Sequence, residues 1–276
     1  VDRHARVLLL TKQLTQLLQR GIGTNRNDVG TRRHHLAHHG LGEVHDRLEE
    51  FTALFFRDLR LAVRSRGRGR SLGGRQLRAV AQRLGVQYLD TGAMYRAVTV
   101  EASRLGFPLA DDAAISAFVV DAVIDVGLDI VRINDRDVTA AIRTAETSQL
   151  VSIVATLSGV RAELRRRQQA WVDERNGGVV EGRDIATVVF PESLLKVYLT
   201  ASPMVRAQRR VAQIGGDVDT IAREIASRDE VDSTRADSPL HAASDSVVVD
   251  TSHRSIDDVV DEIVSLFAER VESWRG

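Results

Sequence analysis

Several residue types are absent or scarce in this chain of 276 residues. It contains no cysteine, which excludes disulfides and thiolate metal sites and is typical of proteins kept in a reducing cytosol. No run of about 18 apolar residues is present, so no membrane span and no membrane partner are expected. The short apolar run at residues 7–10 lacks the small-residue cleavage site of a signal peptide. We therefore expect a cytoplasmic protein.

Lysine is scarce too, and positive charge is almost all arginine. The only two lysines are Lys12 and Lys196. Formal net charge is zero, so no overall field favours nucleic acid, which is not an expected partner. Six of the eight histidines fall within the first 45 residues, where two adjacent pairs between residues 34 and 39 could share a helix face and bind zinc. Without cysteine or a matching carboxylate, a polar tract is the better interpretation, and the metal ligands stay unknown.

Strand and helix patterns alternate along most of the chain. Strands are predicted at residues 59–63, 86–89, 179–180, 196–199 and 247–249, and helices at 76–84, 93–105, 111–122, 147–157, 158–176, 204–214, 218–228 and 256–271. Ser158 is the predicted N-cap of the longest central helix. Residues 123–129 and 130–138 alternate like a hairpin or meander, with a turn at Asn134-Asp135. This order predicts an α/β fold with a parallel sheet covered on both faces.

Three polar segments could carry chemistry. The sequence DTGAMYR at residues 90–96 follows a predicted strand and opens a helix, whose free amides could hold a phosphate. The sequence EGRD at residues 181–184 places an acid and a guanidinium on a loop at a strand end. Arg228, Asp232 and Arg235 recur at helical spacing. An ordinary turn, a local ion pair and a solvated helix face are the respective alternatives.

Taken together and in this order, the three segments resemble the bacterial cytidylate kinase family. The resemblance extends to residues 141–168 and covers roughly two thirds of the chain, from about residue 80 to residue 267. It implies a P-loop kinase-like nucleoside monophosphate kinase fold, in which an insert at about residues 123–155 closes over CMP. It also implies ATP-dependent phosphorylation of CMP or dCMP with Mg²⁺, in a monomer.

The resemblance also assigns roles to individual residues. The cytosine would be read by Ser152, Arg161 and Asp184, the ribose held by Arg228 and Asp232, and the monophosphate bound by Arg96, Arg183 and Arg235 beside the hydroxyl of Thr91. Of these, Arg183 and Arg235 would act directly in catalysis. ATP would be bound by Gly69, Gly74 and Arg75, and by Arg209 and Arg210 as a phosphate lid.

The chain departs from the family at the ATP loop. Relatives of this kind carry a Gly-Lys-Ser/Thr loop whose lysine precedes the DTGAMY run by about 17 residues. That position is Gly73 here, and Gly74 follows where a hydroxyl is expected. A frame shifted by two residues offers Arg75 and Gln76, but the forked guanidinium is a poor substitute for a compact ammonium group. Residues 69–76 are therefore interpreted as a flexible basic loop.

Two explanations of this departure remain open. The chain is a degenerate relative, or residues 1–78 are read from a shifted frame or a misassigned start, which the change of composition near residue 80 favours. We expect an atypical N-terminal segment at residues 1–78, poorly ordered, and a kinase-like domain at residues 79–276 whose first strand is missing or improvised. The rival functions are a non-catalytic CMP-binding protein and, with less support, nucleic-acid binding through residues 64–75.

Overall fold

A computed structural model describes residues 59–65, 72–234 and 243–275, and these belong to one compact unit, Asp58–Gly276. Its centre is a five-stranded sheet in the order β2-β6-β1-β7-β8, in which every neighbouring pair is parallel. The strands are β1 (Leu59–Ser65), β2 (Tyr88–Asp90), β6 (Gly177–Gly182), β7 (Leu195–Thr200) and β8 (Val247–Asp250). Residues 1–58, including the clustered histidines, lie outside the described residues.

Strand β1 lies in the middle of this sheet, between β6 and β7. The expectation that the first strand is missing is therefore wrong, and whether it is an improvised one stays a prediction. Its sequence, LRLAVRS, contains the apolar run Leu61-Ala62-Val63, and the parallel neighbours on both sides supply the hydrogen bonds of a strand. The compact unit thus takes in β1 and the whole of the next helix, which lie before residue 79 or across it.

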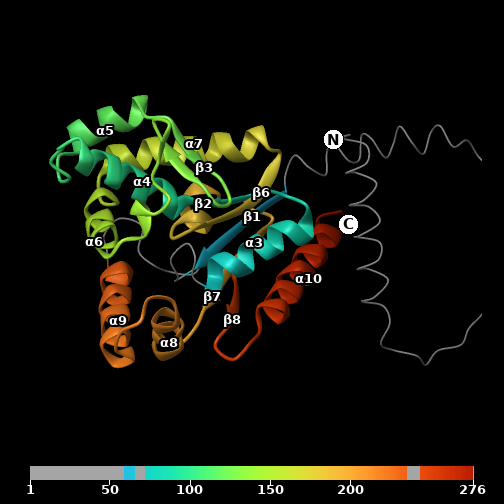
Figure 1. Ribbon diagram of the computed structural model, residues 1–276. Helices are drawn as coiled ribbons and strands as arrows, with labels where there is room; N and C mark the ends of the chain where they lie inside the picture. Colours follow the sequence, from blue (N-terminus) through green and yellow to red (C-terminus); the bar gives the residue numbers. More distant parts are fainter. Residues whose placement is uncertain (1–58, 66–71, 235–242, 276) are drawn as a thin grey trace, which may run out of the picture. The chain divides into compact units, whose positions relative to one another are not determined.

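Helices cover both faces of the sheet, as the sequence predicted (Figure 1). Helices α3 (Leu72–Leu84) and α10 (Ile256–Arg275) pack together on one face. Helices α4 (Thr91–Arg104) and α7 (Ser158–Glu174) lie on the other, with α5 (Asp112–Asp121) against α7 and α6 (Ala145–Val154) against α4. Helices α8 (Pro203–Ile214) and α9 (Val218–Thr234) form a separate pair. No helix in the described ranges is long and apolar enough to cross a membrane.

Helix α3 begins earlier than predicted, at Leu72 instead of Gln76. Gly74 and Arg75 therefore lie in its first turn, and the interpretation of residues 69–76 as a flexible loop is wrong from Leu72 onward. Two adjacent glycines argued against helix on propensity alone. The buried face of the helix, with Leu77, Val80 and Ala81 almost fully enclosed, outweighs that local cost. Residues 66–71, which include Gly69, lie outside the described part of the chain.

The predicted meander exists as a second, antiparallel sheet of β3 (Ile124–Val126), β4 (Val131–Ile133) and β5 (Arg136–Asp137). Its turn lies at Asn134 and Asp135, as predicted, and both have positive φ angles, 48° and 63°. That pair of angles is the signature of the tight two-residue hairpin turn, for which Asn and Asp are among the favoured residues.

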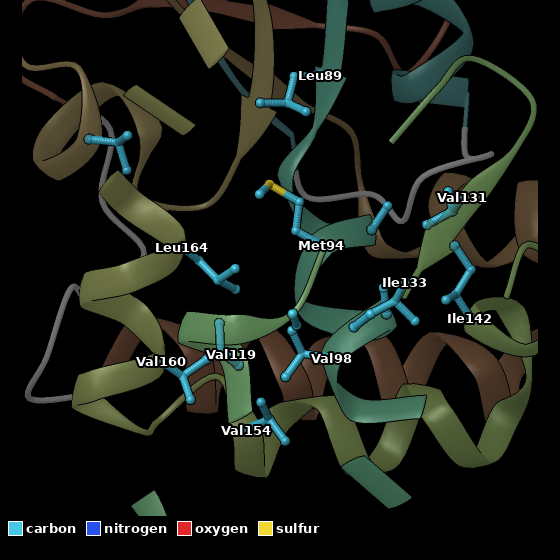
Figure 2. Packing of buried hydrophobic residues seen from close by; sticks show 14 of the residues in the cluster. Leu89, Met94, Val98, Val119, Val131, Ile133, Ile142, Val154, Val160 and Leu164 are labelled. Atoms are coloured by element: carbon cyan, nitrogen blue, oxygen red, sulfur yellow. The ribbon is translucent and has the colours of Figure 1, made fainter. Parts of the chain in front are cut away.

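One hydrophobic core joins the small sheet to α4, α5, α6 and α7 (Figure 2). Ile133 of β4 lies among side chains that include Val98 of α4 and Ile142, and is fully buried. Burying a side chain of this size contributes roughly 1.5–3 kcal/mol. The insert is therefore packed onto α4 through its own core residues, and α4 carries part of the candidate site.

Candidate functional site

Two of the three polar segments, DTGAMYR and EGRD, leave the main sheet at the same edge. Strands β2 and β6 are parallel neighbours, and Asp90 is in register with Glu181. The DTGAMYR run thus continues from the carboxyl end of β2 into α4, and the EGRD run from the carboxyl end of β6. In open α/β sheets this edge is where ligands bind.

Asp90 organises the first of these junctions. Its Oδ1 accepts a hydrogen bond from the backbone N of Ala93 at 3.0 Å and so caps α4. Its Oδ2 accepts one from Nη2 of Arg96, also at 3.0 Å, and both side chains are nearly buried. Gly92 lies between them, where a Cβ would come within 3.0 Å of Arg96 Nη1 and 3.1 Å of Asp90 Oδ1. One carboxylate therefore fixes both the start of α4 and the guanidinium one turn later.

Glu181 anchors the second junction to the first. Its backbone carbonyl accepts a hydrogen bond from Thr91 Oγ1 at 2.7 Å, and its side chain accepts one from the hydroxyl of Tyr88. Burial, reinforced by the charge of Glu181, raises the pKa of Tyr88 well above its ordinary value, so the phenol stays a donor. The Thr91 hydroxyl thus joins the start of α4 to β6, and its oxygen keeps lone pairs that a ligand could use.

Arg161 and Asp184, both predicted to read the base, are brought together by the fold. Arg161 lies in the first turn of α7, and its Nη2 donates to Asp184 Oδ2 at 2.9 Å. The two side chains are only 14% and 19% exposed. Gly182 allows Ile185 and Thr91 to approach the chain closely here, because a Cβ would lie 2.5 Å from both Ile185 Cγ1 and Thr91 Oγ1. Arg183 lies between Gly182 and Asp184, so it leaves the sheet at the same edge.

The remaining residues predicted for the acceptor site belong to α6, to α9 and to the segment after α9. Ser152 lies on α6, is exposed, and its hydroxyl donates to the carbonyl of Gln149 at 2.5 Å. Arg228 and Asp232 lie on α9, but their side chains are outside what the structure describes. Arg235 lies beyond the described end of that helix. The roles of these residues stay predictions.

On the donor side, Gly74 is buried and Arg75 exposed in the first turn of α3. Arg209 of α8 donates to Thr251 twice, from Nη1 to Oγ1 at 3.1 Å and from Nη2 to the carbonyl at 2.5 Å. These bonds tie α8 to the residue that follows β8. Arg210 is adjacent on α8 and half-buried. Whether the last two arginines contact ATP stays a prediction.

Sequence reasoning included Asp90 and Glu181 in its motifs but missed the contacts that they make, and Glu181 lies in strand β6 and not on the predicted loop. The capping bond of Asp90 could have been found, because an Asp directly before a helical pattern is a typical N-cap. The contact between Tyr88 and Glu181 gave no such signal, since 93 residues separate them and only the pairing of β2 with β6 joins them. Within the described ranges no three His, Cys, Asp or Glu side chains are grouped as a metal site.

Known proteins match most of the chain. A sequence model of the family described as cytidylate kinase matches residues 69–269. A cytidylate kinase from Nocardia farcinica is 41% identical over 75% of this chain and 92% of its own length. One from Rhodococcus jostii is 43% identical over 74% of this chain and 92% of its own length. A bifunctional pantoate ligase/cytidylate kinase from Trichormus variabilis is 42% identical over 75% of this chain, but the match spans only 41% of that protein.

Proposed function

Because the chain belongs to the cytidylate kinase family, we propose that it transfers the γ-phosphoryl group of ATP to CMP or dCMP. The observation that carries this proposal is the meeting of the two motifs at one sheet edge, with Asp90 in register with Glu181. That edge holds Arg96 beside the N-terminus of α4 and the Arg161–Asp184 pair beside the end of β6. An anion and a polar base edge are the ligands that such groups suit.

The acceptor half fits the chemistry of the reaction. Phosphoryl transfer requires an in-line arrangement and neutralisation of charge on the transferred group, with little covalent help from the protein. Arg96, Arg183 and Arg235 would neutralise the monophosphate. The Asp184 carboxylate could accept from the exocyclic amine of cytosine, as carboxylates do from this group in DNA recognition. The Arg161 guanidinium would donate to the ring acceptors beside it.

The residues that would hold the ribose and complete the base site are assigned from the family resemblance. Arg228 and Asp232 of α9 would hold the ribose hydroxyls, and Ser152 of α6 would complete the cytosine site. On the donor side, Gly69, Gly74 and Arg75 would lie along the ATP phosphates, with Arg209 and Arg210 approaching from α8.

Magnesium would arrive with ATP. Mg²⁺ in kinases is held largely by phosphate oxygens and water with one or two carboxylates, so a grouped set of protein ligands is not required. The carboxylates at this edge already accept hydrogen bonds: Asp90 from Arg96, Glu181 from Tyr88 and Asp184 from Arg161. The described residues thus offer no dedicated magnesium cage. We further propose that the enzyme acts as a monomer in the cytoplasm, in keeping with its cysteine-free sequence.

A coupled kinase assay with ATP, Mg²⁺ and CMP tests the proposal, together with CMP binding by calorimetry. Turnover supports it, and absence of both turnover and CMP binding would refute it. CMP binding without turnover would favour the non-catalytic alternative. A matched variant separates the two halves: Leu72→Gly, Gly73→Lys and Gly74→Ser write Gly-Lys-Ser at residues 72–74, with the lysine 17 residues before Asp90. If only the donor loop is defective, this variant gains turnover while its CMP affinity stays unchanged.

A further inference from the structure

Helix α7 lacks a capping side chain of its own. Its N-cap residue is Leu157, which makes no side-chain cap bond, so the predicted capping role of Ser158 is wrong. The first amides of a helix have no partner within the helix and are normally satisfied by a side chain or water. A partner from elsewhere in the chain is therefore needed at this end of α7.

Asp112, in the first turn of α5, supplies that partner. Its Oδ2 accepts from the backbone N and the hydroxyl of Ser158, at 3.1 Å and 2.8 Å. Its Oδ1 accepts from the backbone N of Gly159 at 3.2 Å and from the hydroxyl of Ser116 at 2.7 Å. These bonds, first those from Ser116 and Ser158, lower the pKa of Asp112, so the cap carries its negative charge at the positive end of α7.

The contact requires very close approach of the two helices. A Cβ on Gly159 would lie 2.2 Å from Ser116 Oγ and 3.2 Å from Asp112 Oδ1. Only glycine lets α5 and α7 meet at this distance without displacement. The position of α7 along its own axis is therefore set by a residue 46 positions earlier in the sequence.

Arg161 lies in the turn that this contact fixes. Its backbone N donates to the carbonyl of Leu157 at 3.0 Å, and this bond closes the first turn of α7. Its guanidinium donates to Asp184 Oδ2 at 2.9 Å and to the carbonyl of Ala155 at 3.4 Å. A change in where α7 begins would move the guanidinium relative to both acceptors.

We propose that Asp112 is a positioning residue of the acceptor site: by capping α7 from α5, it holds Arg161 against Asp184 in the geometry that reads the base. The proposal rests on the proposed function, because the base site is part of it. Asp112 touches no reacting atom and acts through Arg161 alone. Misplacement of a positioning group by about 1 Å can cost up to about a hundredfold in rate, so the effect is measurable.

The test compares substitutions of two adjacent aspartates. Asp112→Ala removes the contact, and we expect the KM or Kd for CMP to rise about fivefold, the factor that corresponds to loss of a typical cap, with a smaller change in kcat. Asp112→Asn, whose amide oxygen can still cap, should restore most of the CMP affinity. The control is Asp111→Ala, since Asp111 caps α5 itself through the backbone N of Ala114 at 3.1 Å and is not among the residues that cap α7.

A second background separates positioning from general destabilisation. With Arg161→Ala already present, Asp112→Ala should cause no further loss of CMP affinity, although the melting temperature should still fall. A further loss of similar size in that background, or an Asp112→Ala affinity equal to that of Asp111→Ala, would overturn the inference.

The same pair of substitutions keeps the inference testable if the chain neither turns over nor binds CMP. That result would defeat the proposed function. The inference would then be judged by urea unfolding of the four proteins in the Asp112→Ala and Arg161→Ala cycle, because residues in one bonded network show non-additive effects. Additive losses of stability would overturn it, and coupled losses would support it.

Discussion

Asp90 makes two bonds with one carboxylate, and two substitutions can separate them. Oδ1 caps α4 through the backbone N of Ala93, and Oδ2 pairs with Arg96. Asp90→Asn keeps a side chain of nearly the same shape that can still accept from Ala93, because Asn is as good an N-cap as Asp. It removes the negative charge that faces Arg96. Asp90→Ala removes both interactions.

The expected magnitudes follow from burial. Loss of an N-cap typically costs about 1 kcal/mol. The Arg96 and Asp90 side chains are only 13% and 11% exposed, so their pair is little screened by solvent. Hydrogen bonds to charged groups are worth roughly 1.5–3 kcal/mol, and an arginine left partly buried without its partner adds a desolvation cost. We expect Asp90→Asn to lower the free energy of unfolding by about 1.5–3 kcal/mol, and Asp90→Ala by about 2.5–4 kcal/mol.

Urea unfolding at neutral pH measures both values, and Arg96→Met supplies the second half of a double-mutant cycle. In the Arg96→Met background, Asp90→Asn should cost much less, because the charge it removes no longer has a partner. Asp90→Ala should still cost about 1 kcal/mol there, the value of the cap alone. Equal losses from Asp90→Asn with and without Arg96 would refute the claim that this ion pair stabilises the site.

Three further substitutions test other parts of the structure. Gly182→Ala should lower the free energy of unfolding by about 1–3 kcal/mol, as overpacking does, because the new Cβ would lie 2.5 Å from Ile185 Cγ1; thermal unfolding measures it, and an unchanged melting temperature would contradict the geometry. Glu163 has a pKa lowered from 4.5 to about 2, chiefly by its hydrogen bond from Arg166. Its contribution to the free energy of unfolding is therefore full above about pH 4.5 and is lost as the pH falls toward 2. Acid should thus lower the free energy of unfolding of the unaltered protein by about 1–2 kcal/mol more than that of Glu163→Gln, after allowance for solvent screening. Equal acid sensitivity of the two proteins in urea titrations would count against this. Arg183→Ala should weaken CMP binding at least about tenfold, since hydrogen bonds to charged groups are worth roughly 1.5–3 kcal/mol, and unchanged affinity in calorimetry would exclude Arg183 from the monophosphate site.

The sequence predicted most of the helices and strands after residue 85 because their patterns are local. Alternation predicted the meander, and the Asn134-Asp135 pair predicted its turn, since few residues tolerate two successive positive φ angles. Apolar runs at residues 196–199 and 247–249 became the buried strand β7 and the edge strand β8. In each case the local preference and the tertiary environment favoured the same structure.

The wrong predictions for the start of α3 and for the cap of α7 share one cause, which is packing between distant parts of the chain. Leu72 to Arg75 reads as loop because of its two glycines, but α3 is held by its buried face and by contact with α10, which no window of α3 alone reveals. Ser158 is a good N-cap by residue type, yet its hydroxyl donates to Asp112 because α5 packs against that end of α7. Packing between segments far apart in the sequence thus determines where α3 begins and what caps α7, and the spacing of residues within one segment does not reveal such packing.

The contrast between β1 and the α3 turn shows why the fold and the ATP site can differ in how much substitution they tolerate. A central parallel strand needs backbone pairing on both sides, and β1 has it with β6 and β7. A phosphate loop needs one lysine and one hydroxyl at fixed positions, because each makes a bond that no neighbour can replace. The described start of α3 holds Gly73 and Gly74 at those two positions. The sheet can therefore keep the CMP half of the site in position while turnover depends on the few residues that join β1 to α3, and for this reason the CMP affinity and the turnover of the chain have to be measured separately.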